Sequence, residues 1–483
     1  MSRAKPLALL YSYSILSNQH SFKGRIVKRK SPGVFRGGKT APNGAEAVQP
    51  KRDAGVALGE LSAGTSQGTQ QIAPMRYYGT MTVLQEQIAV AEAVAPSTAE
   101  NSKYTRNSPF DSTVMENYLL TGEGSEKETR HVALSLDAGM TYTPGDAVGV
   151  IPENRAEAVA EVLAALGFTG EERVLDHYEV EIGFEEALRT RLAIGKLMRG
   201  SLGQYAKLPG AARCGGNGHD ALKLLCGPDN KARAEEYCWG REFIDLITDF
   251  PGAVAQPQEL FNVLQRLTPR MYSIASSQAA HPGTVETTVR VVRYDAHGRV
   301  RQGLCSGHLG ERADVGATLP IFLHANQNFR MPEDSSAPLI MVGPGTGVAP
   351  FRAFLEHRQA KGETGDNWLF FGEQRRALDY LYEEQFTAMH KGGTLTRLDT
   401  AFSRDQGVKI YVQDRMREHA AEMYAWLECG AYFYVCGDAK RMAKDVELAL
   451  LEVIAKGSNG TLDQAAEYLA TMKKQKRYQL DVY

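Results

Sequence analysis

The 483-residue sequence contains no apolar run of the about eighteen residues that a membrane-spanning helix needs. Its formal net charge of −2 gives no reason to expect a nucleic-acid or membrane partner. The six cysteines form no CxxC pair and a chain this long needs no disulfides, so we expect reduced thiols and a cytoplasmic location. Cys214, Cys226 and Cys238 lie near His219, but their spacing fits no common zinc pattern, so we expect no metal site.

Acidic residues are absent from the first 45 positions, which carry nine Lys or Arg residues. A basic, acid-free start is typical of a mitochondrial transit peptide. The alternatives are a disordered tail, or sequence upstream of a true start at Met75 or Met81. Residues 1–104 are rich in Gly, Ala, Ser and Gln with little apolar periodicity, which predicts a disordered or low-complexity extension.

Strand and helix signals in the middle of the chain predict a β domain with a helical insertion at about 168–265. A helix is expected over Ala156–Leu166, ending at Gly167. Strand signals precede the helical block and return after it, at 131–136, 141–152, 271–275 and 285–294.

After Pro338 the pattern changes to short apolar strands that alternate with helices. The predicted strands are 339–342, 367–371, 394–402 and 432–436. Short, continuous apolar strands separated by helices are typical of a parallel sheet covered on both faces. We therefore predict a doubly wound α/β nucleotide-binding domain.

A glycine-rich turn follows the first of these strands, at Gly343, Gly345 and Gly347. Glycines let the backbone approach a pyrophosphate, and the N-terminus of the next helix supplies free N–H groups. Any tight strand–helix turn also favours glycine. The position of this turn directly after a buried strand is what favours nucleotide binding.

Cations and hydroxyls follow the strand at 394–402, namely Ser403, Arg404, Lys409 and Tyr411. A ribose 2′-phosphate requires such groups, whereas sites for NAD place a carboxylate there. Basic residues in a loop are usually only solvated. Here they follow a strand at the edge of the sheet where an adenosine ribose would lie, which favours a binding role.

Two further motifs carry candidate chemistry. RMYSIASS (Arg270–Ser277) and GLCSGHL (Gly303–Leu309) offer a cation, an aromatic ring and backbone N–H groups for a flavin and its pyrophosphate. Cys436 ends a strand at the sheet edge where ligands bind, although such a cysteine is usually a small packed hydrophobe.

Together these motifs resemble the ferredoxin–NADP reductase superfamily and, within it, the diflavin reductases. Similarity is greatest to the flavoprotein subunits of NADPH-dependent sulfite reductases, from about Pro109 to Tyr483. It is strongest in LTPRMYSIASS, GPGTGVAPFRAF, NWLFFGE, SRDQ, KIYVQD, YVCGDAKRMAKDVE and YQLDVY. The resemblance implies an antiparallel FAD-binding barrel with a helical insert over 105–334, followed by a doubly wound NADP-binding domain over 335–483.

The resemblance also implies roles for individual residues. Hydride transfer from NADPH would take place beside Ser273, Cys436, Asp481 and the terminal aromatic residue Tyr483. FAD would be held by Arg270, Met271, Tyr272, Ser273, Thr288, Val289, Arg290, Tyr294, Gly303, Leu304, Cys305, Ser306 and Tyr483. NADPH would be held by Gly343, Gly345, Thr346, Gly347, Ser403, Arg404, Lys409, Ile410, Tyr411, Val412, Gln413 and Asp445.

Diflavin reductases carry a flavodoxin-like FMN domain before the FAD module, and low-complexity residues stand in its place here. We therefore expect no FMN site in this chain and a separate protein as electron acceptor. The leading expectation is a sulfite reductase hemoprotein, in cysteine biosynthesis. The alternatives are a free flavodoxin, a ferredoxin or a monooxygenase, or a non-catalytic assembly subunit, against which the intact catalytic set argues.

Overall fold

The computed structural model describes residues 103–214 and 218–483. All of them belong to the second of the chain's two units, Met81–Tyr483. The predicted extension over 1–104, with the transit peptide and the alternative starts at Met75 and Met81, therefore lies outside the described residues except for its last two positions. None of the helices in the described part is long and apolar enough to cross a membrane.

Six antiparallel strands form the first sheet, in the order β6-β3-β10-β1-β2-β7. Its buried face carries alternate apolar residues, including Val114, Val132 and Leu319. A closed barrel is not confirmed, because the edge strands β6 and β7 share only the isolated bridge Ile274–Thr287. The strands are β1 (Phe110–Leu119), β2 (Glu128–Ser135), β3 (Ala147–Val150), β6 (Arg270–Ser273), β7 (Thr284–Val291) and β10 (Thr318–His324).

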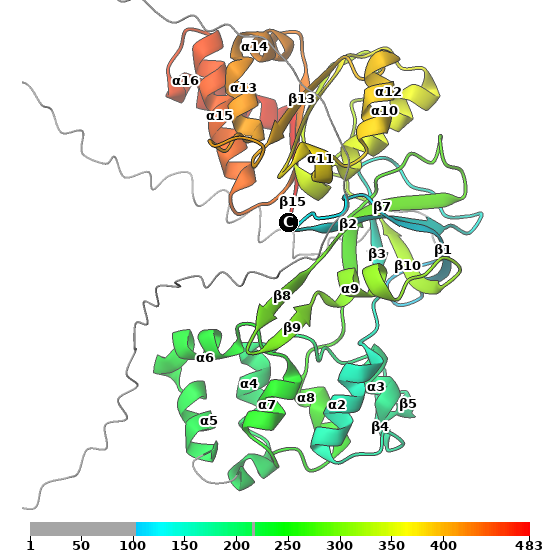
Figure 1. The fold of residues 1–483 in the computed structure, drawn as a ribbon, viewed down its shortest axis with the longest axis vertical. Helices are drawn as coiled ribbons and strands as arrows, with labels where there is room; N and C mark the ends of the chain where they lie inside the picture. The colour runs from blue at the N-terminus through cyan, green and yellow to red at the C-terminus, as the bar shows by residue number, and fades with distance from the viewer. Residues whose placement is uncertain (1–102, 215–217) are drawn as a thin grey trace, which may run out of the picture. The chain divides into compact units, whose positions relative to one another are not determined.

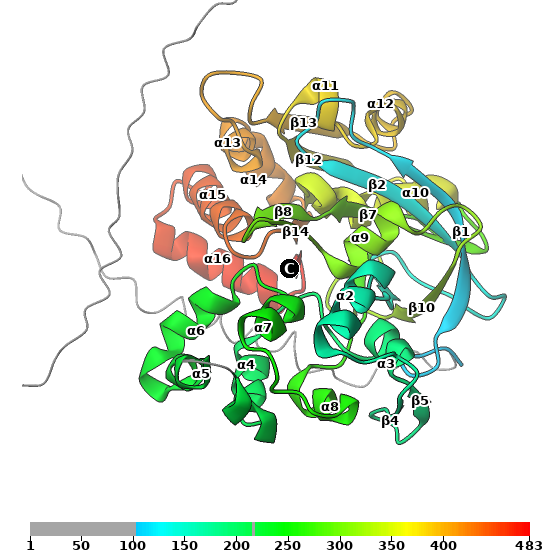
Figure 2. The same ribbon diagram turned by 60° about the horizontal axis from the view of Figure 1, so that its bottom comes forward.

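A helical insert separates β3 from β6 and has a core of its own, built around Phe184, Tyr205 and Phe243 (Figure 2). The predicted helix is confirmed, and Gly167 ends it in the left-handed region with φ 75°. A short hairpin, β4 (Arg173–Leu175) and β5 (Glu181–Gly183), interrupts the predicted helical block. The helices are α2 (Ala156–Leu166), α3 (Phe184–Thr190), α4 (Arg199–Tyr205), α5 (Gly218–Cys226), α6 (Lys231–Cys238), α7 (Phe243–Asp249) and α8 (Leu260–Val263).

A second hairpin, β8 (Arg293–Ala296) and β9 (Arg299–Gln302), continues from β7 and runs toward the insert helices (Figure 1). The helix α9 (Leu304–Glu311) follows it directly. Arg301 in β9 is almost fully buried and binds Glu242 and Asp245 of the insert, at 3.0 and 2.7 Å. A buried ion pair therefore fixes the hairpin to the insert.

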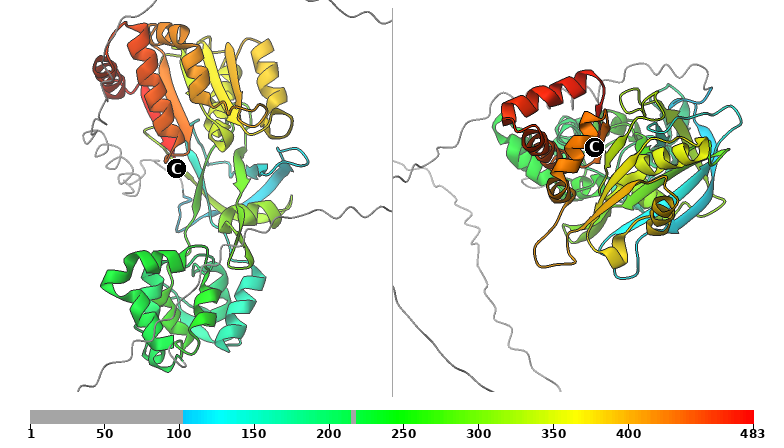
Figure 3. Two further views of the ribbon diagram at one scale, coloured as in Figure 1. Left: turned by 60° about the vertical axis from the view of Figure 1, so that its left-hand side comes forward. Right: turned by 90° about the horizontal axis from the view of Figure 1, so that it is seen from above.

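The second sheet is parallel, with the order β13-β12-β11-β14-β15, and confirms the doubly wound prediction. Side chains alternate between its faces: Ile340 and Val342 pack toward α13–α16, whereas Leu339 and Met341 pack toward α10 and α12 (Figures 1 and 3). The strands are β11 (Leu339–Val342), β12 (Asn367–Glu373), β13 (Arg397–Phe402), β14 (Tyr432–Gly437) and β15 (Tyr478–Val482).

Helices and one 3₁₀ turn cover this sheet on its two faces. They are η4 (Gly345–Val348), α10 (Ala349–Lys361), α11 (Arg376–Asp379), α12 (Glu383–Lys391), α13 (Val412–Glu418), α14 (Ala420–Glu428), α15 (Met442–Gly457) and α16 (Leu462–Lys474). The chain proceeds from β11 to one side of the sheet and returns to the other side with β14. Ligands of such sheets bind at this reversal, at the carboxyl ends of the strands.

A buried charge network joins the two sheets. Arg352 on α10 binds Glu286 of β7 and, at 2.8 Å, Glu356 on its own helix. It also donates to the Ala275 carbonyl at 2.8 Å. All three charged side chains are at least nine-tenths buried. The positive charge therefore compensates two carboxylates that are out of contact with water.

Arg352→Met removes that compensation and leaves two buried carboxylates. We expect it to lower the free energy of unfolding by about 3–5 kcal/mol, the usual effect of breaking a buried ion pair. Denaturant unfolding measures the change. The triple variant with Glu286→Gln and Glu356→Gln is the matched control and should regain most of the loss. A single variant within 1 kcal/mol of the parent would contradict the assignment.

Candidate functional site

Three of the four predicted catalytic residues meet where the sheets adjoin. The Ser273 hydroxyl, at the end of β6, donates a 2.6 Å hydrogen bond to Asp481 Oδ2 on β15. The Cys436 thiol, at the end of β14, lies 3.5 Å from the same oxygen. Cys436 and Asp481 are opposite each other in the parallel pairing of β14 with β15. The register of β14 and β15 therefore places Cys436 beside Asp481, and Ser273 comes from β6 of the antiparallel sheet.

Burial dominates the electrostatics of this cluster. It raises the pKa of the Asp481 carboxyl above its ordinary 3.8, although the hydrogen bonds from Ser273 and Cys436 act in the opposite direction. Burial, together with the adjacent carboxylate, raises the pKa of the Cys436 thiol well above 9.0. Near neutral pH Cys436 is thus a neutral thiol rather than an ionised nucleophile.

The fourth residue, Tyr483, is held by its backbone and its hydroxyl. Its N–H donates to the Gly437 carbonyl at 3.0 Å, and its carbonyl accepts from the Ala439 N–H at 3.2 Å. Its hydroxyl shares a 2.8 Å hydrogen bond with Thr346 in the glycine-rich turn. The ring remains largely exposed. One hydroxyl contact therefore holds an aromatic ring across the end of the site.

The glycine-rich turn packs tightly against the end of β14. A Cβ on Gly347 would lie 2.1 Å from the Cys436 carbonyl oxygen, and one on Gly343 would lie 2.5 Å from the Gly347 carbonyl oxygen. Gly345 has φ 60°, in the left-handed region. The turn and the end of β14 therefore approach so closely that only glycine is accommodated, at the switch point of the parallel sheet.

The predicted 2′-phosphate residues gather beyond β13. Ser403 and Arg404 bond through their backbone N–H groups to the carbonyls of Glu373 and Gln374, at 2.9 and 2.8 Å. Lys409, Tyr411 and Asp445 are exposed, and Gln413 is half-buried. The guanidinium of Arg404 forms an ion pair with Glu126, from the loop after β1. Sequence reasoning missed Glu126, because only the fold brings it near Arg404.

Two residues of this set face the protein interior. Val412 is buried in the core beneath α13, and Ile410 packs against the same core. Their side chains therefore stabilise the loop, and only their backbone groups are available to a nucleotide.

Two groups of the predicted flavin residues lie on strand β6 and at the start of α9. Arg270 and Met271 are exposed, whereas Tyr272 packs against the antiparallel-sheet core. Gly303 caps α9, and the N–H groups of a helix's first turn have no partner within the helix. They belong to Leu304, Cys305 and Ser306, and they suit a pyrophosphate. A Cβ on Gly303 would lie 2.5 Å from Ser306 Oγ, so a larger residue here would require the Ser306 side chain to move.

Other members of the flavin set have structural partners. The Cys305 side chain is buried, and burial raises its pKa to about 12. The Thr288 hydroxyl lies 2.8 Å from the hydroxyl of Tyr382, in the parallel-sheet domain. Val289 is fully buried, whereas Arg290 and Tyr294 are exposed. Of these five side chains, only those of Arg290 and Tyr294 are exposed to contact a ligand.

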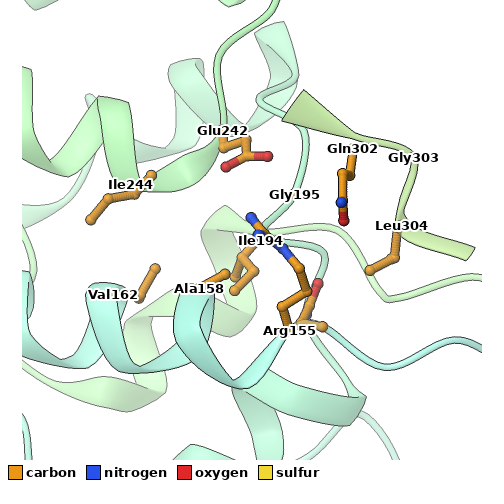
Figure 4. Close-up of a pocket in the computed structure, with 11 residues that line it drawn as sticks. Arg155, Ala158, Val162, Ile194, Gly195, Glu242, Ile244, Gln302, Gly303 and Leu304 are labelled. Carbon is orange, nitrogen blue, oxygen red and sulfur yellow. The ribbon is translucent and has the colours of Figure 1, made fainter. Parts of the chain in front are cut away.

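A small cavity lies behind the pyrophosphate turn, with Arg155, Glu242, Gln302, Gly303 and Leu304 among its lining residues (Figure 4). Its volume of about 30 Å³ suits one water molecule and is far too small for a flavin. The cavity lies between the start of α9 and the insert.

Among the described residues, the group with metal-ligand geometry is His281, Glu286 and Glu356, whose ligand atoms lie within 4.8 Å of one another. Arg352 already binds both carboxylates, so the positive charge is supplied by the protein. Of the three cysteines that drew attention in the sequence, Cys214 and Cys226 each approach a different backbone carbonyl.

Comparison with known proteins finds two domain families in the chain, one in each of the parts that carry the two sheets. The FAD binding domain family matches residues 102–181 and 217–308, and the oxidoreductase NAD-binding domain family matches 341–448. A sulfite reductase [NADPH] flavoprotein alpha-component of Cronobacter sakazakii is 40% identical over 446 residues, covering 92% of this chain and 72% of the relative. The chain belongs to the sulfite reductase flavoprotein alpha-component family.

Two other members of the family match a shorter part of the chain. The Bacillus subtilis protein of that name is 46% identical over 397 residues, which cover 82% of this chain and 64% of the relative. The Vibrio vulnificus protein is 41% identical over 391 residues, covering 81% and 62%. The chain thus spans less than two thirds of the length of these two relatives. It contains an FAD-binding domain and an oxidoreductase NAD-binding domain.

The raised pKa of Asp481 makes a testable contribution to stability. The unfolded chain loses this proton near pH 3.8, whereas the folded protein keeps it to higher pH. The contribution to the free energy of unfolding is therefore full below pH 3.8 and is lost as pH rises through the folded pKa. Unfolding of the parent and of Asp481→Asn is measured across that range. The parent should lose stability relative to the variant as pH rises, and a constant difference would contradict the shift.

Proposed function

We propose that this protein transfers hydride from NADPH to bound FAD and passes the electrons to a sulfite reductase hemoprotein. One observation carries the proposal. The side chains of Ser273, in the FAD-binding domain, and Cys436, in the nucleotide-binding domain, both contact the same carboxylate oxygen of Asp481. A hydride donor and its acceptor require such a meeting point, because their reacting atoms must be held in contact.

FAD, when bound, supplies the hydride acceptor, and the protein supplies orientation and electrostatics. The hydrogen bond from Ser273 to Asp481 holds the carboxylate at the junction of the domains. The neutral Cys436 thiol gives that junction a small polarisable surface. Tyr483 covers the site from the open side, and breaking its single hydroxyl contact with Thr346 releases the ring for nicotinamide.

Preference for NADPH follows from the residues beyond β13. Arg404 pairs a guanidinium with the 2′-phosphate, with Ser403, Lys409 and Tyr411 around it. Arg404 forms an ion pair with Glu126. A doubly charged phosphate competes with this partly exposed carboxylate, since such surface pairs contribute only about 0–1 kcal/mol.

The FAD site uses the exposed side chains and the backbone. Arg270 and the first turn of α9 bind the phosphates, Tyr272 and Ser273 lie beside the flavin ring, and Tyr294 stacks on the adenine. We retain the barrel as the form of the FAD-binding domain, over 105–334, supported by the bridge between its edge strands. The nucleotide-binding domain then occupies 335–483. Free thiols throughout the described part fit a cytoplasmic location.

The acceptor is inferred from the relatives. Their printed names describe the flavoprotein component of an NADPH-dependent sulfite reductase, which implies a second component that reduces sulfite. A second component that reduces sulfite favours a hemoprotein as the electron acceptor over a free flavodoxin, a ferredoxin or a monooxygenase.

Anaerobic reduction of the purified chain tests the proposal. The protein is loaded with FAD, freed of excess flavin and mixed with NADPH or with NADH. We expect the bound flavin to bleach with NADPH, more slowly with NADH, and to recover its colour when a siroheme-containing hemoprotein is added. A preparation that holds no flavin, or whose colour NADPH leaves unchanged, would refute the proposal. Arg404→Gln is the matched variant and should slow only the reaction with NADPH.

A further inference from the structure

An exposed tryptophan stands at the end of α6, in the helical insert. Trp239 is 67% exposed, whereas Trp368 in the parallel sheet is 0% exposed. A large aromatic ring left in water gives up the favourable free energy that its burial would provide. The exposed ring is therefore available to pack against a ligand.

The backbone of Trp239 is fixed against the β8–β9 hairpin. Its carbonyl oxygen lies 2.8 Å from Nε2 of His297. The next residue, Gly240, has φ 67°, and a Cβ there would lie 2.6 Å from the Cβ of Ala296. Together with the buried Arg301 ion pairs, these contacts hold the turn in one position. The ring is therefore exposed on a rigid support.

Tyr294 faces Trp239 from this hairpin. The two ring centroids are 6.5 Å apart and the rings are inclined by 45°. That separation is near the upper limit for aromatic pairs, about 7 Å, so the rings touch little and form the two walls of a wedge. Tyr294 is itself 44% exposed, which leaves its face available.

The wedge lies beside the predicted pyrophosphate turn. The N–H of Gly303 donates to the carbonyl of Val292 at 2.9 Å, and the N–H of Val292 donates to Ser306 Oγ at 3.2 Å. Tyr294 is two residues farther along the same strand segment. A dinucleotide whose pyrophosphate lies at the start of α9 would therefore extend its adenosine toward the wedge.

We propose that Trp239 is a further FAD-binding residue, which covers the adenine from the insert side while Tyr294 covers it from the hairpin side. Stacking on an aromatic side chain is worth about 1–3 kcal/mol for each base. The inference rests on the proposed FAD site. It gives the helical insert a direct part in retaining the cofactor and in selecting FAD over a mononucleotide flavin.

Flavin binding to the full chain tests the inference without reference to activity. Apoprotein is titrated with FAD and, separately, with FMN, which lacks the adenosine. Trp239→Ala should weaken FAD binding by about 5- to 150-fold, the equivalent of losing one stacked base. FMN binding should change less than twofold. Trp239→Phe should recover most of the affinity, and Leu224→Ala, an exposed apolar residue on α5, is the matched control.

Several outcomes would overturn the inference. Unchanged FAD affinity in Trp239→Ala, with weakened affinity in Tyr294→Ala, would remove Trp239 from the site and leave the proposed function intact. Equal weakening for FAD and FMN would show that the tryptophan only supports the fold. A parent chain that binds no FAD would refute the proposed function as well.

Discussion

The hydrogen bond between the Ser273 hydroxyl and the Asp481 carboxylate is the contact on which the site depends. Ser273 ends a strand of the antiparallel sheet, and Asp481 lies on the last strand of the parallel sheet. Neither sheet alone contains a complete site. The relation between the two domains therefore decides whether nicotinamide and flavin can meet, and the chemistry of the site follows from how that relation is maintained.

Two features maintain it. Within the parallel sheet, Gly347 packs against the Cys436 carbonyl so closely that no side chain fits, which fixes the pyrophosphate turn against the catalytic strand. Between the sheets, Arg352 holds Glu286 of the antiparallel sheet beside Glu356 of its own helix. A buried pair of carboxylates is unfavourable without a cation, so these charges resist separation of the domains.

Local signals in the sequence predicted the parallel domain well. The strand Leu339–Val342 was predicted with its observed bounds, because four consecutive buried apolar residues between turn signals have few alternatives. The helix that ends at Gly167 was predicted for a similar reason. By contrast, β1 and β10 were not predicted as strands, since β1 has only two fully buried residues among ten and its alternation is weak.

The sequence predicted the site residues that lie in recognisable motifs, but not the contacts between residues that are far apart in the chain. Motif resemblance supplied Ser273, Cys436, Asp481 and Tyr483, and the structure brings the first three together on one carboxylate oxygen. Contacts that depend on distant pairing left no local signal. Arg352 and Glu286 are 66 positions apart, and a charged residue in a single sequence is normally assumed to be exposed. Trp239 was missed because nothing in the sequence places the end of α6 beside Tyr294.

The central claim is that Ser273 and Asp481 act as one unit at the meeting point of the domains. Stopped-flow measurement of flavin reduction by NADPH in Ser273→Ala, Asp481→Asn and the double variant tests it most directly. Residues that act through a shared hydrogen bond are non-additive, so the double variant should be slowed little more than the slower single variant. Fully multiplicative losses, with FAD bound in all three, would show that the two residues act independently and would contradict the account.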